Sequence, residues 1–80
     1  MDNDIENNIE LRVLLLALYK KTDDETFSDI LGVMENSKVF TKKVGKKYLK
    51  ILKDLKLIDG EGFTFLGIQK AKEVESEFKL

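Results

Sequence analysis

The side chains in this chain with the clearest chemistry are lysines, and they are concentrated in one segment. Residues 38–56 hold eight Lys and a single acid, Asp54, for a net charge of +7 (8 − 1). Residues 1–37 carry a net charge of −6 (3 − 9) and residues 57–80 a net charge of −2 (3 − 5), so the chain as a whole carries −1. A cationic block within an otherwise acidic chain favours a polyanionic partner, because its local potential attracts phosphates whatever the net charge.

The composition excludes most enzyme chemistry. The chain has no Cys and no His, so it lacks thiolate nucleophiles, zinc–thiolate sites and the Ser–His and Cys–His pairs. The segment Gly45-Lys46-Lys47 is not a Walker-type phosphate loop, because Phe40 stands where the first Gly is required and Lys47 where Ser or Thr is required. We therefore predict no enzymatic activity, no catalytic residue, no metal site, no cofactor and no small-molecule ligand.

The lysines must be positioned by helices, which the apolar spacing predicts in an 80-residue, single-domain chain. Residues 1–8 are polar and are predicted to be a tail, and residues 9–80 to be the domain. A first helix over about 9–21 is apolar nearly all round and should be central. A second helix over about 27–35 follows a capping-box pattern at Thr26 and Asp29. It places four apolar residues on one face: Phe27, Ile30, Leu31 and Met34.

A third helix over about 42–56 carries the cationic block. At about 100° per residue its apolar side chains occupy one arc and six lysines the opposite arc. We call these six the Lys face: Lys42, Lys43, Lys46, Lys47, Lys50 and Lys53. Gly45 lies on the apolar side, where it lowers helix propensity and therefore indicates a close crossing with the second helix. Thr41 is the predicted N-cap.

The C-terminal part reads as a hairpin followed by a helix. Two short apolar segments flank Gly60-Glu61-Gly62, which predicts a hairpin over about 57–66. A last helix over about 67–79 carries an apolar stripe of Ile68, Ala71, Val74 and Phe78. The predicted fold class is mostly α with a small β-hairpin. The residues expected in its core are Leu15, Leu16, Leu18, Ile30, Leu31, Leu49, Leu52, Leu55 and Phe65.

Two stretches resemble the winged-helix superfamily of helix-turn-helix regulators. Residues 49–58 are similar to the end of its recognition helix, Leu-x-x-Leu-x-x-x-Gly-Leu-Ile, and residues 63–68 are similar to its returning wing strand and the entry into its last helix. The resemblance covers about residues 9–78 and implies the order helix, helix, helix, strand, strand, helix. The chain departs from the family at Lys56, where Gly is usual, so we expect this helix end to be built differently. The hairpin turn is short and acidic, without the Arg or Lys of a wing that enters a minor groove.

The resemblance implies a double-stranded DNA-binding protein, a transcriptional regulator or accessory factor, with the 42–56 helix against DNA. The predicted DNA-binding residues are Thr41 and the Lys face. The only Arg of the chain is Arg12, so bidentate Arg–guanine contacts are excluded there, and phosphate contacts should dominate. The alternative is a winged-helix protein-interaction module that binds no nucleic acid. An exposed Lys face can also be ordinary solvated surface.

Assembly and location follow from the remaining residues. The stripe Ile68, Ala71, Val74 and Phe78 either closes the core against the first helix or pairs with a second copy. The family resemblance favours a homodimer, because many such regulators bind two half-sites. The longest apolar run is Val13–Tyr19, which is too short for a membrane helix of about 20 residues. We therefore predict no membrane partner and a cytoplasmic location.

Overall fold

The structure, a computed structural model, describes residues 8–60 and 62–78 of the chain. Within this part the helices are α2 (Ile9–Lys20), α3 (Phe27–Asn36), α4 (Lys42–Asp54) and α5 (Phe65–Phe78). The strands β1 (Ile58–Asp59) and β2 (Gly62–Phe63) form an antiparallel hairpin between α4 and α5, in which Ile58 faces Phe63. The expected mostly α architecture with a small β-hairpin is confirmed, and the elements follow in the expected order. The predicted tail lies outside the described residues except for Asn8, whose side chain caps α2.

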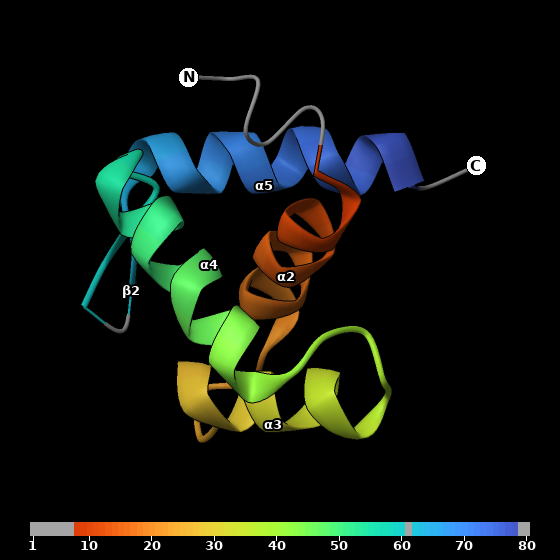
Figure 1. Cartoon of the computed structure of the whole chain (residues 1–80). Coiled ribbons are helices and arrows are strands. Elements are labelled where there is room, and N and C mark those ends of the chain that lie inside the picture. Colours follow the sequence, from red (N-terminus) through yellow and green to blue (C-terminus); the bar gives the residue numbers. More distant parts are fainter. Residues whose placement is uncertain (1–7, 61, 79–80) are drawn as a thin grey trace.

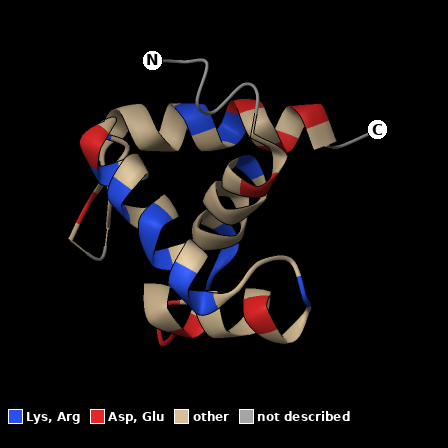
Figure 2. Cartoon of the chain, in the orientation of Figure 1, with Lys and Arg blue, Asp and Glu red and all other residues tan. Residues whose placement is uncertain are grey.

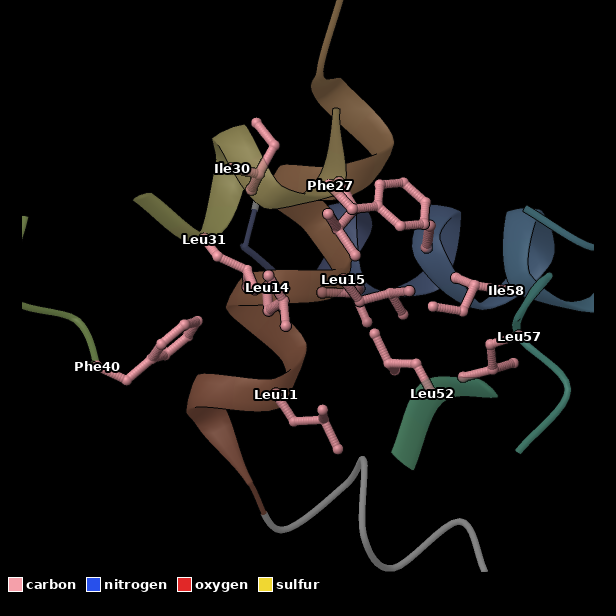
Figure 3. Packing of buried hydrophobic residues seen from close by; sticks show 13 residues of the cluster. Leu11, Leu14, Leu15, Phe27, Ile30, Leu31, Phe40, Leu52, Leu57 and Ile58 are labelled. Atoms are coloured by element: carbon pink, nitrogen blue, oxygen red, sulfur yellow. The ribbon is translucent and has the colours of Figure 1, made fainter. Parts of the chain in front are cut away.

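Helix α2 is the centre of the fold. It contacts α3, α4 and α5, and Figure 1 shows it between α5 and α3 with α4 alongside. Four leucines of α2 are almost completely buried: Leu11, Leu14, Leu15 and Leu18. Figure 3 shows Leu14 and Leu15 among side chains of the other elements, including Leu31 and Leu52. The prediction that the first helix is covered on several sides is thus confirmed.

The predicted core is correct for most of its members and wrong for Phe65. Leu15, Leu18, Ile30, Leu31 and Leu52 are buried, and Leu16, Leu49 and Leu55 pack against them half-buried. Phe65 is instead 77% exposed. It was expected in the wing strand, but α5 begins there, two residues earlier than predicted. The aromatic side chain that packs inward is Phe63, with its ring 5.9 Å from that of Tyr19 and 6.4 Å from that of Phe27.

Two helices end on a lysine in the left-handed conformation. Lys38 after α3 has φ 62° and Lys56 after α4 has φ 65°. In both cases the N–H of the following residue donates a hydrogen bond to the carbonyl five residues earlier. Val39 N donates to the Met34 carbonyl (2.9 Å), and Leu57 N donates to the Leu52 carbonyl (3.0 Å). This is the hydrogen-bond pattern that glycine usually supports. The expectation of a different helix end at Lys56 was wrong, because the lysine adopts the conformation that Gly would.

Gly45 lies at the crossing of α3 and α4, as its place in the sequence predicted. A Cβ at this position would lie 2.6 Å from Leu31 Cδ2 and 2.8 Å from Phe40 Cε1. Gly45 is itself buried. The absence of a side chain therefore lets α4 approach α3 closely, and this approach fixes how α4 presents its opposite side.

Helix α5 closes the core against α2. Ala71 and Val74 are completely buried, and ion pairs join Arg12 to Glu77 and Lys20 to Glu75. Because Ala71 and Val74 are buried within the same chain, these two residues of the apolar stripe belong to the core and are not available for contact with a second copy. A homodimer through the other two, Ile68 and Phe78, stays a prediction. Within the described residues, no helix combines the length and apolarity needed to cross a bilayer.

Candidate nucleic-acid interface

Helix α4 has two sides with separate roles. Its inner side holds it to the core through buried Gly45 and Leu52 and through half-buried side chains such as Val44, Tyr48 and Ile51. On the other side Lys43, Lys46, Lys47, Lys50 and Lys53 are exposed, while Lys42 is half-buried. Figure 2 shows this row of basic residues along α4. The structure therefore brings the predicted site residues together on one helix.

The Lys face carries concentrated and uncompensated charge. Its span along the helix, from Lys42 to Lys53, corresponds to about 16 Å at 1.5 Å per residue. With Asp54, the helix has a net charge of +5 (6 − 1). No ion pair within the described residues involves a side chain of the Lys face; the basic partners are Arg12, Lys20 and Lys70. The six ammonium groups are therefore left to solvent and to partners.

Apart from Asp54, the acidic residues lie outside α4. They are concentrated in the 22–25 loop, in α3 and in the C-terminal half of α5 (Figure 2). The charge asymmetry seen along the sequence is thus also an asymmetry in space. A polyanion approaching the molecule would be attracted to α4 and repelled by the α3 and α5 ends.

Two backbone N–H groups in the first turn of α4 are hydrogen-bonded within the chain. Thr41 accepts a hydrogen bond from Val44 N at 3.3 Å, as its predicted role of N-cap requires. The Glu35 carboxylate accepts a second from Lys42 N at 3.1 Å. Helix N-termini often bind phosphate through such N–H groups, but here a carboxylate takes that place. At this end of α4 the lysine side chains are therefore the main groups available to an anion, and the Thr41 hydroxyl caps the helix.

Tyr48 fixes the orientation of α4 on α2. Its hydroxyl donates a 2.6 Å hydrogen bond to the Glu10 carboxylate, and its ring packs edge-on against Phe40 at 5.3 Å. The bond to Glu10 and then burial raise the pKa of Tyr48 above its ordinary value. Sequence reasoning missed Glu10 and Glu35. Neither pairing follows from helical periodicity, because both partners lie on other elements.

The hairpin beside α4 brings no cation to the interface. Asp59 is exposed in β1, and residues 57–66 contain no Lys or Arg. The predicted acid of the turn, Glu61, lies outside the described residues. No group of acidic residues within the described part of the chain could hold a metal ion. The basic surface is therefore α4 with Lys56, which follows it.

Comparison of the chain with family models, with curated proteins and with solved structures finds no match.

Proposed function

We propose that this chain is a small double-stranded DNA-binding protein of the winged-helix type that lays α4 against the phosphates of a major groove. The observation that carries the proposal is the Lys face, with six lysines on one side of one helix and no acid paired with them among the described residues. The order of helices and hairpin supports the winged-helix assignment. A transcriptional regulator or an accessory DNA-binding factor is the corresponding role.

The dimensions of α4 suit a major groove. An α-helix with its side chains is about 10–12 Å across, and the groove is about 12 Å wide. The Lys face extends over about 16 Å of helix, so its two ends reach toward the phosphates on both edges of the groove. The apolar side of α4 stays on the core throughout, so binding requires no rearrangement of the fold.

The chemistry of α4 predicts weak sequence selectivity. The helix has no Arg, Asn or Gln, which are the side chains that make bidentate contacts with guanine and adenine. Lysine can neutralise phosphates, but phosphate contacts carry no base information. We therefore expect affinity to depend strongly on salt and little on base sequence.

The test is a fluorescence titration of labelled duplex DNA at several salt concentrations. Each neutralised phosphate contributes a slope of about −0.9 to log K against log[salt]. The double substitution Lys43→Gln and Lys47→Gln should flatten the slope by up to about 2 units. It should do so equally on unrelated sequences. The matched control is Lys20→Gln with Lys72→Gln, which removes the same charge from exposed positions of α2 and α5 and should leave most of the slope intact.

The second candidate is a protein-interaction module, which the acidic character of the hairpin favours. Exposed Asp59 would face the DNA backbone if the hairpin approached it. In this alternative the Lys face binds an acidic protein. An absence of duplex binding at micromolar concentrations and low salt would exclude the DNA proposal in favour of this one. Equal slopes for the two double variants would exclude α4 as the binding helix.

A further inference from the structure

The most exposed large hydrophobic side chains of the described chain include an adjacent pair. Phe65 is 77% exposed and Leu66 is 52% exposed at the first two positions of α5. In that part of the chain, the other exposed large hydrophobics are single residues: Ile9 on α2, Val33 on α3 and Phe78 at the far end of α5. Single exposed hydrophobic residues are ordinary. An exposed aromatic side chain next to a second apolar one, in a chain this small, indicates a partner.

The base of this apolar pair is rigidly held beside the end of α4. Thr64 N donates to the Leu57 carbonyl at 3.1 Å, and Thr64 Oγ1 donates to the Lys56 carbonyl at 2.6 Å. The same hydroxyl accepts from Gly67 N at 2.9 Å and so caps α5. Figure 1 shows α5 beginning next to the C-terminal end of α4. Phe65 therefore directly follows Thr64, and the hydroxyl of Thr64 is hydrogen-bonded to Lys56, the last residue of the basic segment.

We propose that Phe65, supported by Leu66, is a wedge that inserts between base pairs in the minor groove next to the major groove occupied by α4. This inference rests on the proposed DNA binding of α4. Apolar side chains on rigid supports unstack base steps in this way and kink the duplex. Exposed Lys53, in the last turn of α4, and exposed Lys56, just after it, precede the wedge along the chain and can neutralise the phosphates that separate the two grooves. The interaction needs no cation on the hairpin itself, which agrees with its composition.

The size of the molecule allows it to reach two adjacent grooves. Neighbouring major and minor grooves are about 17 Å apart, half of a helical turn of about 34–36 Å. The molecule extends 26 × 25 × 23 Å, so it can cover both grooves at once. A DNA base step is favoured over a lipid surface because the Lys face extends along a helix rather than around the apolar pair.

The experiment uses the absence of Trp from the chain. Phe65→Trp introduces a single Trp at the wedge, and Phe78→Trp introduces one at the opposite end of the same helix as the matched control. On addition of duplex DNA, the Trp at position 65 should lose most of its emission by stacking and become shielded from acrylamide. The Trp at position 78 should change in neither respect. Energy transfer between dyes at the two ends of the duplex should rise on binding, because a wedge kinks DNA by about 20–90°.

The duplex affinity of a Phe65→Ala variant tests the wedge separately from the DNA binding of α4. Phe65→Ala should weaken duplex binding by about 5- to 150-fold, the range expected for one lost base–aromatic contact. It should abolish the rise in energy transfer and leave the salt slope unchanged. Because Phe65 is largely exposed, circular dichroism should show an unaltered fold. If the wild-type chain binds duplex with the expected slope but Phe65→Ala binds equally well, the wedge is refuted and the proposed function stands.

Three other outcomes would overturn the wedge. No duplex binding by the wild-type chain would remove the proposed function and the wedge together. A blue shift of the Phe65→Trp emission on vesicles of anionic lipid, with no response to duplex, would assign the apolar pair to a membrane surface. A free wild-type chain that sediments as a dimer while Phe65→Ala sediments as a monomer would assign the pair to contact with a second copy.

Discussion

Replacing Gly67 with Ala is expected to separate the start of α5 from the end of α4. A Cβ at Gly67 would lie 2.7 Å from the carbonyl carbon of Leu57 and closer still to its oxygen. Both are backbone atoms, so no side-chain rotation can relieve the overlap. Ordinary contact begins at 3.4 Å, so the two segments must move apart by at least 0.7 Å (3.4 − 2.7).

This movement would disrupt the hydrogen bonds that hold α5 in place. The bond from Thr64 N to the Leu57 carbonyl, now 3.1 Å, would lengthen to about 3.8 Å or more and cease to be a hydrogen bond. Its loss costs about 1 kcal/mol, and overpacking of this kind costs about 1–3 kcal/mol more. The higher helix propensity of Ala returns at most about 1 kcal/mol. We expect a net loss of about 1–3 kcal/mol, out of a total stability of about 4–12 kcal/mol for a domain of this size.

Urea unfolding followed by circular dichroism measures this loss. With a slope of about 1–3 kcal/mol per M, the midpoint for Gly67→Ala should fall by about 1 M. Gly32→Ala is the matched control, because a Cβ there would meet nothing within 4 Å. In the middle of α3, that substitution should raise stability by up to about 1 kcal/mol. A Gly67→Ala chain that unfolds at or above the wild-type midpoint would refute the close contact between α5 and the Leu57 carbonyl.

Three further substitutions test the local structure of α4. Lys56→Gly should raise the thermal unfolding midpoint, because Lys56 has a left-handed φ of 65° and Gly avoids the strain of about 1 kcal/mol that a side chain incurs there. A lower midpoint would contradict this. The pKa of Tyr48 is raised in the folded chain, so its hydrogen bond to Glu10 stabilises the fold below about pH 10. This stabilisation is lost as the pH rises through the folded-state pKa, and the free energy of unfolding should therefore fall above about pH 10. Tyr48→Phe should be less stable at neutral pH and should lose part of this alkaline sensitivity; an unchanged pH profile of the unfolding midpoint would rule out the Glu10 bond. Glu35→Gln should tighten duplex binding severalfold by removing a negative charge beside Lys42, and titrations showing weaker binding would argue against α4 as the interface.

The helices and the membership of the Lys face were predictable because both depend on local periodicity. Side chains three and four residues apart share one side of a helix wherever the helix packs. The crossing at Gly45 was also predictable, because a glycine on the apolar side of a helix weakens that helix unless a neighbouring element packs closely against it. These features need only the sequence of one element and a rule that applies within it.

The parts that could not be predicted depend on how separate elements meet. The bonds of Glu35 to Lys42 N and of Tyr48 to Glu10 join residues whose sequence separation carries no periodic signal. Phe65 was misplaced because a strand and the first turn of a helix look alike over two residues. The left-handed lysines could not be anticipated, since Lys is a rare residue for a conformation that favours Gly.

The Lys face destabilises the free protein, and this is the strongest physical reason to assign it a partner. Like charges four residues apart, such as Lys43 and Lys47, each cost a few tenths of a kcal/mol. Cations in the first turn of α4 also oppose the helix dipole, which Glu35 offsets only at Lys42. None of the exposed lysines of this face makes an ion pair within the described residues that would compensate for this cost. A polyanion removes the repulsion when it binds, and a ligand present at about 100 times its dissociation constant stabilises the folded chain by about 2.7 kcal/mol. A surface that is unfavourable alone and favourable when bound is what a phosphate-binding helix requires.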